Sequence, residues 1–233
     1  MRPSGHVSAK ARVSASGRRR DPSSPVSRRP VPFDAAEALL KATSDLMREK
    51  NGAEPSVAEI AERAQVAPAL IRYYYGTKDS LLLELLKRDM APGHEQLNFL
   101  LTADMSATEK LRQHISGMIN LYYRVPYLNQ LMLILAQREK NDEFADEATR
   151  LMKPLSEFHR VILSQGFKSG ELRYIDPMLF YFSLLGIVDR IFSAKYSLGV
   201  LFGRDEVDAD LKRRFTEHSI DLLLGGILAS PIL

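Results

Sequence analysis

Apolar residues recur at helical spacing through almost the whole chain from Phe33 onward. No segment shows the sustained alternation of apolar and polar residues that is typical of a half-buried strand. Helix signals divide the pattern, because Ser56 and Ser106 each begin a capping box with a glutamate three residues later, and Pro92-Gly93 and Pro126 favour helix ends. We therefore predict an all-α fold made of several helices.

The helix signals also predict two helical domains. The predicted helices occupy residues 34–50, 56–64, 68–74, 77–91, 106–125, 127–140, 143–165, 177–196 and 208–228. Three short helices and a connector helix fall within residues 33–90, which we take as one domain, and the rest belong to a larger domain at 91–233. Gly166 and Gly170 are expected to break the chain before the penultimate helix.

Charge is distributed unevenly along the sequence. Residues 1–32 contain eight basic residues and one acid, whereas the remainder contains 24 basic and 28 acidic residues, so a segment of +7 precedes a body of −4. This segment is rich in Ser, Pro and Arg, which predicts a disordered arm. It is either an arm that binds a polyanion, with Arg18, Arg19 and Arg20 as candidate DNA contacts, or a solubilising extension.

The composition excludes several classes of protein. The chain has no cysteine, which excludes disulfides, cysteine-ligated metals and cysteine nucleophiles. The longest apolar stretch, 178–188, is far shorter than the roughly 20 residues of a membrane span, and the N-terminus has no apolar signal region, so we expect a cytoplasmic protein with no membrane partner. The five histidines are scattered, and no phosphate loop or nucleophile elbow occurs. We expect no enzymatic activity, no cofactor and no metal site.

The most informative segment is residues 55–81, PSVAEIAERAQVAPALIRYYYGTKDSL. A helix-turn-helix needs buried apolar residues at fixed offsets and a small residue where its two helices cross. The buried set is Ile60, Ala64, Val66 and Ile71, with Ala61 at the crossing. The second helix, opened by Pro68, would present Ala69, Arg72 and Tyr73 outward, as a helix in a DNA major groove does. An ordinary helical hairpin in a core is the alternative.

The same run resembles the DNA-binding domain of TetR-type transcriptional regulators. The matching residues are Ile60-Ala61, Ala64, Val66, Tyr74-Tyr75, Thr77-Lys78 and Leu81. The resemblance covers residues 33–90 and extends loosely to the turn at 166–177. It implies that Tyr74, Thr77 and Lys78 anchor DNA phosphates, and Ser56 is placed for a further phosphate contact at a helix N-terminus. Tyr75, where the family has Phe, is expected to pack in the core.

Two residues depart from the family pattern. Gln65 stands where the family usually has Gly, and a left-handed Gln costs roughly 1 kcal/mol. Arg72 stands where Tyr is common, and it is able to reach a phosphate, read a guanine or pair with a nearby acid. Residues 33–90 also carry a net charge of −2, from eight basic residues and ten acids, which is unusual for a duplex-binding domain.

The larger domain is rich in apolar and aromatic side chains. Core packing accounts for most of them, and the resemblance implies that some line a pocket for a small, hydrophobic effector. The candidates for this pocket are Met118, Tyr122, Met132, Phe158 and Phe182.

The helix at 177–196 is apolar nearly all round, which predicts partners on several sides. Residues of this helix would pack with the last helix and, across a two-fold axis, form a four-helix dimer interface. These residues are Leu184, Leu185, Val188, Ile191, Phe215, Leu222, Leu223 and Ile227. Gly186 predicts a close approach, either to the partner or to the chain's own last helix, and the core of a monomer is the alternative.

Together these features predict a ligand-responsive, homodimeric transcriptional regulator, most simply a repressor that a small hydrophobic effector releases from double-stranded operator DNA. The alternative is an all-helical small-molecule-binding or enzymatic protein that does not bind DNA.

Overall fold

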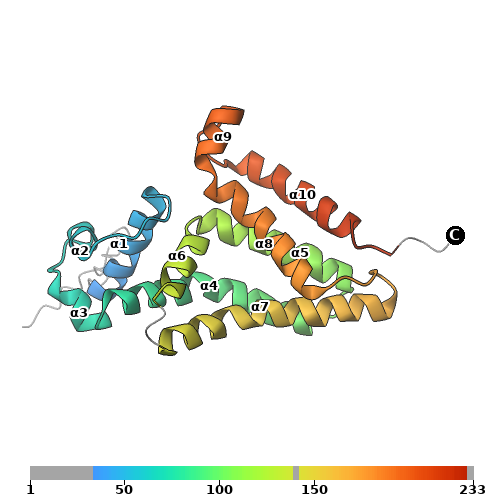
Figure 1. Ribbon diagram of the computed structural model, residues 1–233, viewed down its shortest axis with the longest axis horizontal. Coiled ribbons are helices and arrows are strands. Elements are labelled where there is room, and N and C mark those ends of the chain that lie inside the picture. The colour runs from blue at the N-terminus through green and yellow to red at the C-terminus, as the bar shows by residue number, and fades with distance from the viewer. Residues whose placement is uncertain (1–33, 139–141, 230–233) are drawn as a thin grey trace, which may run out of the picture. The chain divides into compact units, whose positions relative to one another are not determined.

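The structure is a computed structural model that describes residues 34–138 and 142–229. The predicted arm at 1–32, with Arg18, Arg19 and Arg20, lies outside the described residues. The helices are α1 (Ala35–Glu49), α2 (Val57–Ala64), α3 (Ala69–Tyr75), α4 (Lys78–Thr102), α5 (Ala107–Arg124), α6 (Leu128–Ala136), α7 (Asp142–Ser169), α8 (Pro177–Ser193), α9 (Lys195–Phe202) and α10 (Ala209–Gly225) (Figure 1). In the described parts of the chain the one extended feature is an isolated bridge between Leu172 and Leu228. The all-α prediction is confirmed.

Side-chain caps explain where several helices begin. Ser56 accepts a hydrogen bond from the backbone of Glu59 and the Glu59 carboxylate accepts one from the Ser56 backbone, which is the predicted capping box. Thr77 and Ser106 also accept hydrogen bonds from backbone N–H groups at the N-termini of α4 and α5. The box predicted at Ser106 is only half formed, because the Glu109 carboxylate contacts Gln113 and Arg112 instead. These caps satisfy backbone donors that a helix leaves free in its first turn.

Helix α4 is longer than predicted. We expected it to end before Pro92, but it continues through Pro92 to Thr102. A proline inside a helix costs roughly 3 kcal/mol because it removes a hydrogen bond and crowds the preceding turn. Leu97 and Leu100 follow the proline and are buried in the main core, and this burial offsets the cost. The helix therefore crosses the predicted domain boundary near residue 90.

Helix α7 also passes through residues that we expected to break it. It contains Pro154, and it includes Gly166 and ends at Ser169, whereas the prediction ended at Gln165. A methyl group at Gly166 would overlap the Leu172 side chain and lie 3.0 Å from the Cβ of Ala107. Gly166 is therefore present because helix α7 approaches its neighbours closely, and it does not mark a turn.

The helix predicted at 177–196 is two helices. Helix α8 ends at Ser193 and α9 begins at Lys195, with a bend of 69° between them, and neither Pro nor Gly marks the break. Over the described residues no single helix is long and apolar enough to cross a membrane. The bent pair α8–α9, taken together, has sufficient length and apolar composition, and nothing else in the described residues indicates a span.

Two clusters of buried side chains hold the fold together, and α4 contributes to both. The smaller cluster joins α1, α2, α3 and the start of α4, with Leu39, Ile60 and Leu81 fully buried. The larger one includes Leu82 and Leu85 from α4 and extends through the remaining long helices. Leu81, which packs in the smaller cluster, is thus followed directly by Leu82, which packs in the larger one.

Polar contacts join the first helices to the rest of the molecule. The Tyr127 hydroxyl donates to Asp89 Oδ2 at 2.6 Å and shares a hydrogen bond with Ser44 Oγ at 2.8 Å. The Arg48 guanidinium donates to the carbonyl of Arg124 at 2.6 Å. Burial, followed by the nearby Asp89 charge, raises the pKa of Tyr127 well above its ordinary value, so this residue stays a neutral hydrogen-bond donor.

Candidate nucleic-acid interface and effector cavity

Helices α2 and α3 form the predicted helix-turn-helix. The turn between them holds Gln65 in the left-handed region, at φ 57° and ψ 42°, the conformation in which we expected a residue other than glycine to be strained. The backbone N–H groups of Gln65 and Val66 donate to carbonyls of α2, including Ala61. These hydrogen bonds close the helix end around the left-handed residue and offset its strain.

Helix α3 turns its apolar side inward and its polar side to solvent. Ile71 is buried, whereas Ala69, Arg72, Tyr73 and Tyr74 are exposed. Tyr73 is 77% exposed, and its ring lies 4.9 Å from that of Tyr74 in an edge-on arrangement. Because these neighbouring side chains are exposed, this face of α3 is free to contact another molecule.

Tyr75 lies on the opposite side of α3 from the exposed tyrosines. It packs against the smaller core, and its hydroxyl donates to the carbonyl of Ala36 at 2.8 Å. The expectation that Tyr75 is a core residue is confirmed.

The predicted phosphate anchors at the helix N-termini are already engaged within the chain. Ser56 and Thr77 use their hydroxyls as caps. Lys78 forms an ion pair with Glu54, and its Nζ donates to the carbonyl of Pro55 at 3.4 Å. A phosphate at Lys78 must therefore compete with Glu54.

Glu54 is shared between the helix-turn-helix and the larger part of the molecule. The Arg138 guanidinium, which follows α6, lies 2.7 Å from Glu54 and 3.2 Å from Asp79. Together with Lys78 these residues make a four-member ion-pair network beside the start of α4. The network fixes the loop before α2 against the N-terminus of α4.

Ion pairs explain how a segment with net negative charge retains a free cation on its outer face. Arg63 makes two hydrogen bonds with Glu49, at 2.7 and 2.8 Å. Lys50 pairs with Glu59 and, with the cap at Ser56, holds the pKa of Glu59 at about 2. Of the three cations in 55–81, all of them within the described residues, Arg72 is the one in no ion pair.

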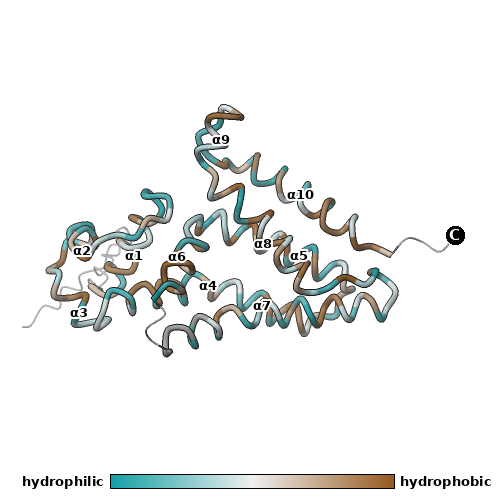
Figure 2. Tube along the Cα trace, viewed as in Figure 1, coloured by the Kyte–Doolittle hydropathy of each residue, from teal (hydrophilic) through white to brown (hydrophobic). Residues whose placement is uncertain are grey.

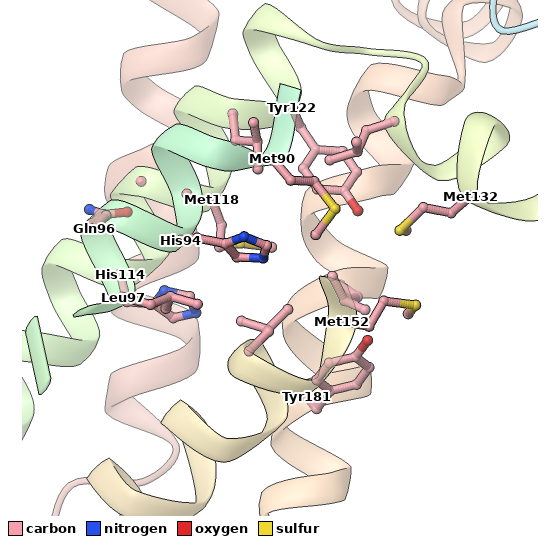
Figure 3. Close-up of a pocket in the computed structure, with 16 residues that line it drawn as sticks. Met90, His94, Gln96, Leu97, His114, Met118, Tyr122, Met132, Met152 and Tyr181 are labelled. Atoms are coloured by element: carbon pink, nitrogen blue, oxygen red, sulfur yellow. The ribbon is translucent and has the colours of Figure 1, made fainter. Parts of the chain in front are cut away.

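A cavity opens between α4, α5, α6, α7 and α8. It is lined by Met90, Gly93, His94, Gln96, Leu97, His114, Gly117, Met118, Leu121, Tyr122, Leu128, Met132, Met152, Leu155, Tyr181 and Leu185. Figure 3 shows the His94 imidazole and the hydroxyl end of Tyr122 directed toward the same space, with methionine sulfur atoms around it. The free space is about 50 Å³, well below the roughly 300–1,000 Å³ of typical ligand pockets. Four methionines in the wall give it adaptable packing.

Three of the five predicted pocket residues, Met118, Tyr122 and Met132, line this cavity. Phe158 is fully buried beside it, with its ring 4.7 Å from that of His114. The prediction for Phe182 is wrong for this cavity, because Phe182 lies on the outer side of α8 and is 65% exposed.

Sequence reasoning missed the polar members of the wall, above all His114. This histidine on α5 lies beside His159 of α7, with their Nε2 atoms 2.9 Å apart. Forty-five positions separate them in the sequence, which gives no signal of a pair. Within the described residues, no group of three or more His, Asp or Glu side chains is arranged to hold a metal ion.

The predicted dimer residues divide into buried and exposed sets. The interface prediction is wrong for Leu184, Val188, Leu223 and Ile227, because each is already buried within the single chain. Residues with so little accessible surface leave almost nothing for a partner subunit to cover. Leu185 lines the cavity, and Ile191 and Phe215 are half-buried.

Leu222 alone of the predicted set is well exposed, at 57%, and Met178, Leu179 and Phe182 on α8 are exposed with it. A methyl group on Gly186 would meet nothing within 4 Å, so the chain's own last helix makes no close approach there. Figure 2 shows hydrophobic colouring along α8 and at the end of α9, where Val200, Leu201 and Phe202 are also exposed.

Family models match most of the chain. The model described as bacterial regulatory proteins, tetR family, matches residues 39–85, and the tetracyclin repressor-like C-terminal domain matches residues 104–231. The HTH-type transcriptional regulators BetI of Brucella melitensis biotype 2 and of Brucella abortus are 26% identical over 117 residues, which cover 43% of this chain. The match spans 59% of the length of those relatives.

Two solved structures have the same fold. AibR in complex with isovaleryl coenzyme A and operator DNA matches with a TM-score of 0.65 at 21% identity, over 82% of this chain and 98% of that one. FadR from Bacillus subtilis in complex with stearoyl-CoA matches with a TM-score of 0.59 at 23% identity, over 82% and 98%. With a C-terminal family model matching over half of its length and an N-terminal model matching its helix-turn-helix, the chain belongs to the TetR family of bacterial transcriptional regulators.

Proposed function

We propose that this regulator binds double-stranded operator DNA as a homodimer and represses transcription until a hydrophobic effector releases it. The observation that carries the proposal is the outer face of α3, where Arg72 and Tyr73 are exposed and Arg72 is in no ion pair within the described residues. A guanidinium that forms no ion pair with the described residues is available for a phosphate or for a bidentate contact to guanine.

The exposed apolar face of α8 and α10 supports the dimer. Phe182 and Leu222 are more than half exposed against the described residues, and Gly186 lies on the same side of α8 with open space in front of it. A second copy that packs these helices against their equivalents would bury this surface and form a four-helix bundle. The revised interface is therefore the outer side of the two helices that the sequence singled out.

Helix α4 and the start of α6 are the elements that connect the two sites. Lys78 begins α4 at the helix-turn-helix, while Met90 and His94 of the same helix line the cavity. Tyr127 binds α1 and α4 directly before Leu128, another cavity residue. An effector larger than the present cavity must displace these walls, and a differential affinity for the widened state of 1–3 kcal/mol is enough to change operator occupancy.

The effector we propose is a hydrophobic molecule, and an acyl-CoA is the class that two structures of similar fold contain. The apolar cavity suits the acyl part. Arg48, Arg124 and Lys195 line an open groove between α1, α5 and α9, together with Glu206, and this cationic groove suits phosphate groups.

The basic arm adds to DNA binding through its charge. Its +7 compensates for the net −2 of residues 33–90, because each phosphate neutralised releases counterions. Deletion of residues 1–30 should weaken DNA binding and reduce its salt dependence without changing the fold or the dimer.

The test is salt-dependent binding to DNA upstream of the regulator's own gene, followed by footprinting. Wild-type protein and the matched surface variant Arg150→Ala should protect one site, and Arg72→Ala should lose much of its preference for that site over random DNA. Equal affinity of wild-type protein for specific and random duplexes would contradict the proposal and favour the alternative of a binding protein that does not recognise DNA.

A further inference from the structure

Two buried histidines share a hydrogen bond at the side of the cavity. His114 and His159 are each almost completely inaccessible to water, and their Nε2 atoms are 2.9 Å apart. In the part of the chain that the structure describes, neither Nδ1 has a hydrogen-bond partner. Buried nitrogens without partners are rare because each costs about 1–3 kcal/mol, so these two atoms call for an explanation.

Burial keeps both imidazoles neutral. It lowers the pKa of His114 well below its ordinary value, with the neighbouring His159 adding to the effect, and it lowers the pKa of His159 to about 4. Phe158, Phe180 and Tyr181 surround the pair with aromatic rings, which offer no charged group to an imidazolium.

The neutral pair has two tautomeric arrangements. One Nε2 must carry the proton of the shared hydrogen bond, and the other must accept it. If His159 donates, His114 carries its own proton on Nδ1 and offers a donor. If His114 donates, its Nδ1 carries a lone pair and offers an acceptor. Since Nε2 of His114 is held by His159, Nδ1 is the ring nitrogen of this cavity-lining residue that has no partner among the described residues.

The other polar groups in the wall are more restricted. His94 Nε2 lies 2.8 Å from the carbonyl of Leu151, and a carbonyl only accepts, so neutral His94 has its proton on Nε2 and offers an acceptor on Nδ1. The competing donors are the Tyr122 and Tyr181 hydroxyls and the second amide hydrogen of Gln96, whose Nε2 already donates to the carbonyl of Gln113. The described wall contains no Lys, Arg, Asp or Glu side chain.

We propose that His114 Nδ1 is the hydrogen-bonding anchor of the effector, that it selects an uncharged carbonyl such as that of a ketone, ester or thioester, and that His159 sets its tautomer. The carbonyl accepts from His114 Nδ1–H, and His114 Nε2 accepts from His159 Nε2–H. This inference rests on the proposed function in one respect, because it assumes that the cavity is the effector site.

Four probes of matched size test the anchor. Each probe contains one phenyl ring, and the probes differ in the group attached to it. Acetophenone carries a carbonyl, 1-phenylethanol carries a hydroxyl, benzoate carries a carboxylate, and ethylbenzene carries no polar atom. We expect acetophenone to bind wild-type protein about tenfold more tightly than ethylbenzene, as for one hydrogen bond to a buried donor, and benzoate to bind most weakly. Titration calorimetry at pH 7.5 measures the four affinities.

Variants locate the hydrogen bond. His114→Phe should make acetophenone and ethylbenzene bind equally, while His94→Phe should leave their ratio at about tenfold because His94 offers only an acceptor. His159→Phe should reduce the ratio of acetophenone to ethylbenzene affinity, because His114 then loses the partner that keeps its proton on Nδ1. The ratio compares two ligands on one variant, so a general loss of stability does not affect it.

Nitrogen-15 spectra of labelled histidines give a readout that a purely structural role would not move. Acetophenone should shift His114 in the wild-type protein to the form protonated on Nδ1, and ethylbenzene should not. The anchor would be overturned if the ratio of acetophenone to ethylbenzene affinity were unchanged in His114→Phe, or if it were lost instead in Tyr122→Phe or Tyr181→Phe. Tighter binding of benzoate than of acetophenone would also overturn it. So would the failure of all four probes to bind.

Operator release is measured separately in the same samples. If acetophenone binds through His114 but the protein stays on its operator, the anchor stands and the proposed response to an effector fails for that ligand. If a ligand releases the operator equally from wild type and His114→Phe, the response stands and the anchor fails.

Discussion

The outer face of α3 and the wall of the cavity use polar groups in opposite ways. On α3, Arg72 is charged and exposed, whereas Arg63 and Lys78 of the same helix-turn-helix segment are held in ion pairs. In the cavity, His114 is neutral, buried and without a charged residue in the described wall. The first arrangement suits a polyanion in water, and the second suits an uncharged molecule that brings its own hydrogen-bonding group. The two ligands should therefore respond differently to salt, pH and substitution.

The largest effects, on stability and on the oligomeric state, should come from placing a charge on the buried or on the exposed side of α8. Val188→Glu puts an unpaired carboxylate among fully buried side chains and should lower the free energy of unfolding by about 4 kcal/mol or more. Phe182→Glu changes an exposed position and should leave a folded monomer. Circular dichroism with light scattering separates these outcomes, and a dimeric Phe182→Glu protein would mean that the interface lies elsewhere.

Salt should separate the two sites next. Raising salt from about 50 to 200 mM should weaken operator binding by about three orders of magnitude if the dimer neutralises about six phosphates. Acetophenone affinity should stay within about twofold because the described cavity wall carries no charged side chain. Parallel titrations of both ligands measure this. Equal salt slopes would remove the distinction between the two regions.

Acid should affect the buried pair before the exposed ion pairs. The pKa of His159 falls from 6.5 to about 4 on folding, so between these values the unfolded chain binds more protons. The free energy of unfolding should then decrease as pH falls from 6.5 to 4, by about 3 kcal/mol for this group, and be independent of it at higher pH. Urea unfolding at several pH values should show this decrease in wild type and less of it in His159→Phe. Identical profiles would indicate that the pair is not buried as described.

The smallest effects should distinguish Arg72 from Lys78 on the DNA side. Arg72→Ala should lower operator affinity by about 1–3 kcal/mol with relaxed specificity and no loss of stability. Lys78→Ala removes the ion pair with Glu54, so it should lower the free energy of unfolding by about 0.5–1 kcal/mol. It should also weaken binding to every duplex. Stability unchanged in Lys78→Ala would show that Glu54 does not hold this residue.

The sequence predicted the DNA side well because its determinants are local. The offsets of Ile60, Ala64 and Ile71, the cap at Ser56 and the exposed position of Tyr73 all follow from helix period and turn chemistry within one short segment. The sequence marked Gln65 only as the residue in the place of the family's usual Gly, and the structure shows that it adopts the left-handed conformation.

The cavity was less readable because it depends on contacts between distant segments. Nothing near His114 in the sequence indicates that His159 will lie against it, and Phe182 is as apolar as the residues that line the cavity. The period of α8 defines its faces but not which of them meets the core and which meets solvent. The same limit explains why Val188 and Leu222 were assigned together, although only Leu222 is exposed.

The proline within α4 gives that helix a point of low stiffness. Pro92 has no N–H to donate to the carbonyl of Arg88. One backbone hydrogen bond of the helix is therefore missing between His94 at the cavity and Lys78 at the DNA-binding end. The fourteen positions from Lys78 to Pro92 span roughly 21 Å at 1.5 Å per residue. A tilt of about 5° at Pro92 would therefore move the Lys78 end by roughly 2 Å, which exceeds the tolerance of a hydrogen bond. A very small displacement of α4 at the cavity would thus produce a larger displacement of its Lys78 end, because of the distance between the two. That displacement would change how the helix-turn-helix fits against DNA.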